Sequence, residues 1–227
     1  MIQVKKVYLD CFEGENIYMK FIYGKLKMSW LTVIVFAVAA GCYTGWIMTV
    51  DCLKGTSFQD IGIFFEWWVI FAVIIVVNCK KSWEAMLKCF LFFLISQPLV
   101  FFVEFLLGHI NPDMAIYYYT TNWLPKTFLT LPGGFIAYFC KKESVTGAIV
   151  LGIGNTILLL MGVYYTSQAI KSFPMHLISA VVCYAAVLIM SFSIQKTRRY
   201  RTIALLLPVI LALIAAVAFR MMGRVFI

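Results

Sequence analysis

The chain has 227 residues, of which 63% are apolar and 13% are charged, and its formal net charge at pH 7 is +9. Water-soluble domains are about 45–50% apolar and about 25% charged, so this composition excludes an ordinary soluble enzyme, a disordered chain and a small disulfide-stapled secreted module. We therefore expect an integral membrane protein.

Residues 1–28 precede the first long apolar run and carry no cleavable signal pattern. Within them, Ile17, Tyr18 and Phe21 recur at helical spacing among lysines. This pattern predicts an interfacial helix that lies on anionic headgroups at the inner face, with a loosely ordered tail as the alternative. We expect residues 29–227 to form a single transmembrane bundle.

A bilayer core about 30 Å thick requires about 17–25 apolar residues in a helical crossing. Seven runs of that length are present, and no loop between them is long enough to hold a soluble domain. The sequence thus predicts an all-α, polytopic bundle of about seven transmembrane helices, with six as the alternative count. The predicted spans are 29–50, 60–78, 86–107, 123–140, 145–166, 173–194 and 202–219.

The basic residues predict the orientation, because cytoplasmic loops carry an excess of lysine and arginine. With seven spans, fourteen of the 19 basic residues fall on the side of the N-terminus, and Lys54, Lys126, Lys171, Arg220 and Arg224 fall on the other. We expect a multi-pass protein of the cell membrane with its N-terminus in the cytoplasm and its C-terminus outside. Basic residues confined to short loops favour contacts with anionic lipid and argue against a nucleic-acid partner.

Metal and cofactor chemistry has no support in the sequence. The seven cysteines are scattered, with no C-x-x-C spacing and no H-x-x-x-H pair, and only two histidines are present. Most of these cysteines lie within apolar runs, where cysteine acts as a small hydrophobic residue. We expect no metal site and no cofactor.

Small residues predict where helices pack against each other. Lipid tails are as apolar as leucine, so helices in a membrane associate through close backbone contact and buried polar bonds. Gly41 and Gly45 mark such a face in the first span, and Gly152 marks one in the fifth. Asn155 lies on that second face near the middle of the membrane, so we expect it to face protein and to bond to another helix.

Prolines interrupt three of the predicted spans, at Pro98, Pro132 and Pro208. Pro132 is followed by two glycines in the middle of an 18-residue span. That sequence is the strongest local indication of a broken helix of the kind that lines a polar cavity, and a simple kink is the alternative.

Ionisable residues inside predicted spans are the main candidates for function, because they are costly to place in a bilayer. Glu66, Glu104, Lys126 and His176 come from four different spans and are predicted to lie at one level near the outer surface. Opposite charges at one depth reduce each other's burial cost. The layer is therefore either a structural ion-pair lock or a ligand-binding site.

Two further residues extend this candidate ligand-binding site. Gln97 shares a helical stripe with Glu104, and Trp67 follows Glu66 directly and offers an aromatic face to a ligand. The other aromatic residues near span ends, including Trp123 and Tyr165, are expected to be interfacial anchors.

The first functional hypothesis is a transport or solute-capture component for a small molecule or ion, with a polar site that opens outward. The chain's size and the small-residue face of its first span resemble the vitamin-capturing subunits of energy-coupling transporters, which usually have six helices; no vitamin-specific motif is present. The chain has no phosphate-binding loop for ATP, so active transport would require an ion gradient or a membrane or ATPase partner subunit.

Two alternatives remain at this stage. One is a non-catalytic membrane partner in assembly, immunity or sensing, whose polar layer only fixes packing. The other, which is less favoured, is an intramembrane enzyme. The sequence contains no H-E-x-x-H or G-x-S-x-G motif and no nucleophile beside a histidine, so no catalytic residue is assigned.

Overall fold

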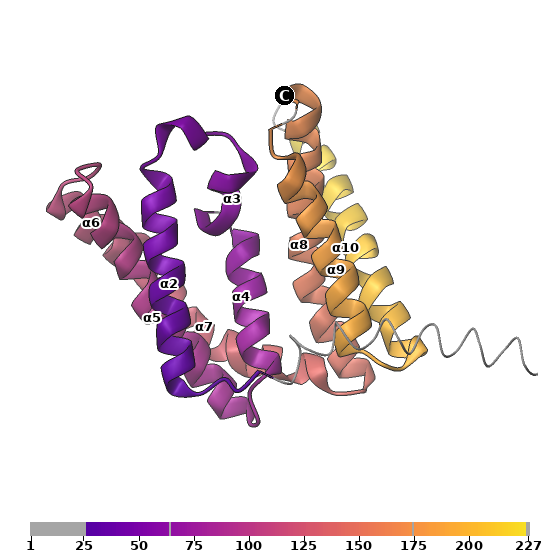
Figure 1. Cartoon of the computed structure of the whole chain (residues 1–227). Coiled ribbons are helices and arrows are strands. Elements are labelled where there is room, and N and C mark those ends of the chain that lie inside the picture. The colour runs from indigo at the N-terminus through magenta and orange to yellow at the C-terminus, as the bar shows by residue number, and fades with distance from the viewer. Residues whose placement is uncertain (1–25, 64, 174, 226–227) are drawn as a thin grey trace, which may run out of the picture.

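A computed structural model describes residues 26–63, 65–173 and 175–225, with the side chains at 61–63, 65 and 216–225 left aside. The regular elements of the described chain are all helices, and it contains no strand (Figure 1). The predicted interfacial helix of residues 1–28 falls almost entirely outside these residues. The α-helices are α2 (Trp30–Met48), α3 (Ser57–Ile63), α4 (Phe65–Val77), α5 (Ser82–Leu106), α6 (Pro112–Tyr118), α7 (Leu124–Ala137), α8 (Val145–Lys171), α9 (Leu177–Ile194) and α10 (Arg198–Val225).

Four of these helices, α2, α5, α8 and α9, are long and apolar enough to cross a membrane. This confirms an all-helical protein compatible with membrane insertion. In the text below, the upper end is the top of Figure 1, where α2 leads into α3, and the lower end is where α4 leads into α5.

The described part of the predicted second span consists of α3, which ends at Ile63, and α4, which begins at Phe65. At 1.5 Å per residue, the 13 residues of α4 cover only about 20 Å, which is less than the thickness of a bilayer core. The upper part of this segment is therefore built by α3, which carries Ser57 and Asp60 into the bundle.

The predicted fourth span begins earlier than expected. Helix α6, a π-helical segment Tyr119–Trp123 and α7 follow one another without a break from Pro112 to Ala137. Pro132 lies inside α7, which continues to Ala137. The broken-helix hypothesis at Pro132 was therefore wrong and the kink alternative remains, while the irregular turn of this segment is the π-helix that precedes α7.

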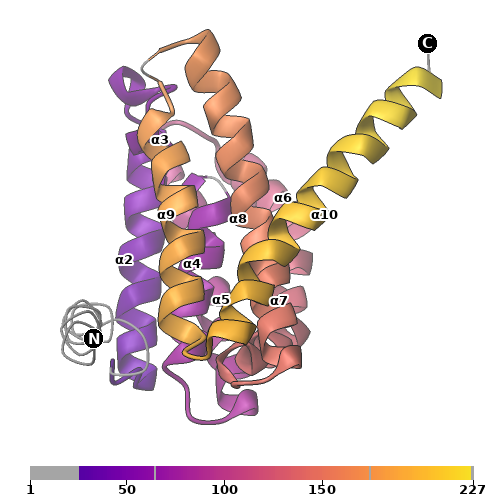
Figure 2. The same ribbon diagram turned by 90° about the vertical axis from the view of Figure 1, so that its right-hand side faces the viewer.

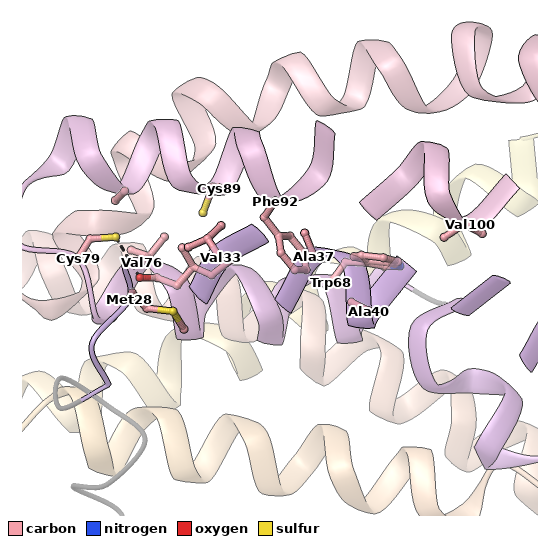
Figure 3. Close-up of a cluster of buried hydrophobic side chains, with 12 residues drawn as sticks. Met28, Val33, Ala37, Ala40, Trp68, Val76, Cys79, Cys89, Phe92 and Val100 are labelled. Carbon is pink, nitrogen blue, oxygen red and sulfur yellow. Dashed lines mark hydrogen bonds between the residues drawn. The ribbon is translucent and has the colours of Figure 1, made fainter. Parts of the chain in front are cut away.

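Helix α4 packs between two groups of helices, α2, α5 and α7 on one side and α8, α9 and α10 on the other (Figures 1 and 2). Apart from Glu66 in its first turn, its sequence is apolar on every face, as expected of a helix buried on both sides. Trp68 and Ile75 join the cluster with α2 and α5 shown in Figure 3, whereas Ile70 and Val73 pack against the cluster formed with α8, α9 and α10.

Close contact between α2 and α5 confirms the predicted small-residue face. A Cβ atom on Gly41 would lie 2.6 Å from the carbonyl oxygen of Ser96, and one on Gly45 would lie 2.6 Å from that of Val100. These distances leave no room for a side chain at either glycine. Since both helices run from the lower to the upper end, successive turns of α2 rest on successive turns of α5.

Asn155 on α8 also behaves as predicted. Its side chain is fully buried, and its amide nitrogen donates to Ser191 Oγ on α9 at 2.9 Å and to the carbonyl oxygen of Ala204 on α10 at 3.4 Å. One amide therefore joins the three helices of the second group.

The lower end is held together by hydrogen bonds between loops. Lys141 Nζ donates to the carbonyl oxygen of Cys79, and Tyr138 donates to that of Lys80. Gln195 Nε2 donates to the carbonyl oxygen of Cys140 at 2.5 Å. These bonds connect the two groups of helices below α4.

Candidate functional site

A buried polar network lies at the upper end, between the α3–α4 segment and the α8–α9 pair. Asp60 on α3 is 1% exposed, and one of its carboxylate oxygens lies 2.9 Å from Nδ1 of His176, the residue before α9. The same oxygen accepts a hydrogen bond from Ser179 Oγ at 2.5 Å. Ser57 completes this part of the network by accepting from the backbone N–H of Ser179 at 3.3 Å.

The second half of the network is centred on Glu66 of α4. Its side chain is fully buried, and Oε1 accepts a hydrogen bond from the hydroxyl of Tyr165 on α8 at 2.5 Å. The other oxygen, Oε2, is buried without a hydrogen-bond partner. The ring of Tyr165 stacks on that of His176, with centroids 5.7 Å apart and planes 21° apart. The two buried acids are thus linked through an aromatic pair, and we call Asp60, Glu66, Tyr165, His176 and Ser179 the outer network.

The helical register of α4 explains why Glu66 faces α8. Glu66, Ile70, Val73 and Val77 follow one another at intervals of three or four residues, and the last three pack in or against the cluster with α8 and α9. Glu66 extends that stripe toward the upper end, where Tyr165 meets it. A glutamate on the opposite face of α4 would instead meet the aromatic cluster around Trp68.

His176 is held in an unusual backbone conformation. Its φ is +62°, in the left-handed region that L residues seldom adopt, and histidine is among the few side chains enriched there. Such a conformation persists when its surroundings hold it. Here the carboxylate of Asp60 and the ring of Tyr165 fix the imidazole from two sides.

Two of the other predicted residues lie near Glu66 in height. The rings of Trp68 and Phe93 are 5.7 Å apart, which aligns α4 with α5. Glu66 lies two residues above Trp68 on α4, and Gln97 lies four residues above Phe93 on α5. At 1.5 Å per residue, Gln97 is therefore within about 3 Å of the level of Glu66. Nε2 of Gln97 and Nε1 of Trp67, the residue that follows Glu66, are both buried without a hydrogen-bond partner.

Glu104 is separated from this level. The same count places it roughly 13 Å nearer the upper end than Glu66. It is 6% exposed, and its Oε1 is buried without a hydrogen-bond partner. The prediction of a single layer therefore does not describe Glu66 and Glu104.

Lys126 lies elsewhere on the molecule. It is exposed on α7, and its ammonium lies 4.6 Å from the centre of the Trp123 ring. Among the described residues, no hydrogen bond or ion pair joins it to Glu66, Glu104 or His176. Of the six residues predicted for the site, the structure brings together Glu66 and His176 through Tyr165.

Three members of the outer network were not predicted. Tyr165 was expected to be an interfacial anchor, but it is fully buried. Asp60 is the first residue of the predicted second span and Ser179 lies in the first turn of α9, where polar residues are ordinary and signal nothing by themselves. The available clue was the spacing of six residues between Asp60 and Glu66, which places two acids along one predicted crossing.

The arrangement does not form a hydrolytic triad, although it contains a serine, a histidine and an aspartate. Ser179 donates its hydroxyl hydrogen to Asp60 and makes no hydrogen bond with His176 in the described structure. A nucleophilic serine requires a base that accepts its proton, and a carboxylate already paired with histidine does not serve. Among the described residues, no group of histidine, cysteine and acidic side chains could hold a metal ion.

An apolar groove of about 230 Å³ lies beside the outer network, between α8 and α9. Two of its lining residues are close in sequence to the outer network. Ala169 comes one helical turn after Tyr165, and Leu177 directly follows His176. The others are Thr166, Ile170 and Phe173.

Comparison with known proteins finds no matching family model, curated protein or solved structure.

Proposed function

We propose that this chain is a transport or solute-capture component of the cell membrane that binds a small solute or ion at the outer network. The observation that carries the proposal is Glu66, a fully buried acid whose Oε1 is bonded to Tyr165 and whose Oε2 has no partner. Buried polar atoms are nearly always paired, and an unpaired one marks a place for water, an ion or a ligand.

Several buried polar atoms on α4 and α5 have no hydrogen-bond partner, which supports a binding site rather than a structural ion-pair network. A structural ion-pair network would pair its members. Instead, buried donors on Trp67 and Gln97 and a buried acceptor on Glu66 all lack partners near one level. A bound solute with a donor group would satisfy Oε2 of Glu66.

The charges of the outer network indicate what kind of solute fits. Asp60 has His176 as its partner, whereas Glu66 has the neutral hydroxyl of Tyr165. An ionised carboxylate in a membrane interior requires a nearby positive charge, or else it takes up a proton. A proton or a small solute with a positively charged group is therefore the class that we propose.

The proposed topology has seven crossings, with the N-terminus in the cytoplasm and the outer network toward the outside. Helices α3 and α4 together make one crossing, and α6, the π-helical segment and α7 together make another. The basic residues of the lower loops support this orientation under the positive-inside rule, for example Lys80 and Lys142.

The test measures thermal unfolding of the purified chain with protonated amines, quaternary ammonium compounds, carboxylic acids and sugars. One cationic class should raise the midpoint for the unsubstituted chain and for Glu143→Gln, which removes a remote carboxylate. Glu66→Gln should stay folded and lose that response. The proposal would be defeated if no solute raised the midpoint of the parent chain while Glu66→Gln unfolded at a lower temperature. That result would show that Glu66 has a structural role only.

A further inference from the structure

The depth of Lys126 in the membrane follows from a nearby contact between α7 and α5. The rings of Phe128 and Phe90 are 5.5 Å apart. Phe90 lies eight residues from the lower end of α5, and α7 runs in the opposite direction to α5, so the helical rise places Lys126 roughly 15 Å above that end. With a bilayer core about 30 Å thick, Lys126 lies close to the middle of the membrane.

A lysine at this depth lacks the usual ways of avoiding its burial cost. Lysine side chains reach the interface from near helix ends, and this one is near mid-membrane. Its contact with the Trp123 ring at 4.6 Å supplies a cation–π attraction but no counter-charge. Since the side chain is exposed, it faces either lipid or another protein.

The surrounding face of α7 has the composition of a helix contact. Leu129 and Gly133 follow Lys126 at intervals of three and four residues, and both are exposed. A Cβ atom on Gly133 would meet nothing within 4 Å, so a neighbouring helix could approach the backbone there. Asn122 adds an exposed amide one turn before Lys126.

We propose that this face of α7, formed by Lys126, Leu129 and Gly133, binds a transmembrane helix of a different protein that carries an ionised carboxylate at mid-membrane. Charge complementarity selects the acid. A second copy of this chain does not supply it, because Glu66 and Glu104 are buried and Glu84 is paired with Lys88 in the described structure. This proposal rests on the proposed seven-crossing topology, in which α7 crosses the membrane, and not on ligand binding at the outer network.

The test uses a defined probe, a leucine–alanine transmembrane peptide with a single glutamate at its centre, and matched peptides with glutamine or leucine there. The full chain carries a donor fluorophore on a C-terminal tag and the peptides carry an acceptor, in phosphatidylcholine vesicles. Energy transfer should be strongest with the glutamate peptide. Lys126→Leu should weaken that association by roughly 3- to 30-fold, and Lys126→Arg should keep it.

Three results would overturn the inference. The first is equal association of all three peptides with the unsubstituted chain, a comparison that requires no variant to fold. The second is no loss on Lys126→Leu in a variant that unfolds at the parent's temperature. The third is Lys126-dependent energy transfer between two copies of the chain without peptide, which would make a second copy the occupant.

Discussion

Tyr165 on α8 donates its hydroxyl hydrogen to Oε1 of Glu66 on α4, and both side chains are fully buried. This bond connects the two groups of helices at the upper end, as the loop bonds connect them at the lower end.

The Tyr165–Glu66 bond should contribute measurably to stability. Tyr165→Phe leaves both oxygens of Glu66 buried without a partner, and we expect it to lower the free energy of unfolding by about 1–3 kcal/mol. The adjacent Tyr164, which is 47% exposed, provides the matched control. Tyr164→Phe should change stability by less than about 0.5 kcal/mol. Thermal unfolding in detergent measures both, and equal effects would contradict the assignment.

The contact between α2 and α5 should tolerate no added volume. Gly45→Ala places a Cβ atom 2.6 Å from the carbonyl oxygen of Val100 and 2.7 Å from Cβ of Val103, so one helix must move. We expect a loss of about 1–3 kcal/mol. Gly154→Ala on α8 is the control, because its Cβ would meet nothing within 4 Å. A Gly45→Ala chain as stable as Gly154→Ala would show that the helices separate without cost.

Glu143 should make stability depend on pH in the acid range. Burial raises its pKa, but the backbone N–H groups of Lys196 and Thr197 donate to the carboxylate at 2.6 and 3.1 Å and outweigh that effect, so the pKa lies below its usual value. A lowered pKa in the folded state means that the stabilisation is complete above the unfolded value of about 4.3 and is lost as pH falls through the folded one.

Thermal unfolding of Glu143→Gln and of the parent chain between pH 7 and pH 3 tests this statement. The parent should be the more stable at pH 7, and the difference should shrink at the acid end. Asp113→Asn, at an exposed aspartate of α6, should follow the parent throughout. A difference that stays constant over the whole range would show that the carboxylate charge is not involved.

The proposed orientation can be tested by labelling with a membrane-impermeant thiol reagent. Cys52 is exposed in the upper loop, whereas Cys79 and Cys140 are buried and would be protected on either side of the membrane. An informative partner is Lys142→Cys, at an exposed residue of the lower loops, in a chain with Cys52 replaced by serine. In intact cells the reagent should label Cys52 and leave the cysteine at position 142 unmodified. The reverse pattern would invert the topology.

The sequence was a good guide to packing and a weaker guide to depth. The glycine face at Gly41 and Gly45 and the buried bond of Asn155 follow from the need of membrane helices for close contact and paired amides, and both are present. Hydropathy locates apolar runs but not where one helix ends and the next begins. The start of α6 was missed for that reason.

The candidate site was recoverable only in part. Glu66 and His176 stand out as ionisable residues in apolar runs, which is a local signal. Their partners do not, because Asp60 and Tyr165 have roles that depend on the heights at which α3 and α8 meet. The fourth helix was expected to begin at residue 123, whereas the continuous helical segment begins at Pro112.

The loop bonds at the lower end have a consequence for motion. With Lys141 joined to the carbonyl of Cys79, and Gln195 to that of Cys140, the two groups of helices share a pivot at that end. Any separation between them should then be largest at the upper end, and it would require the Tyr165–Glu66 bond to break. Under the proposed function, a solute would enter and leave at the upper end, and its passage to the other side would first require the loop bonds at the lower end to break.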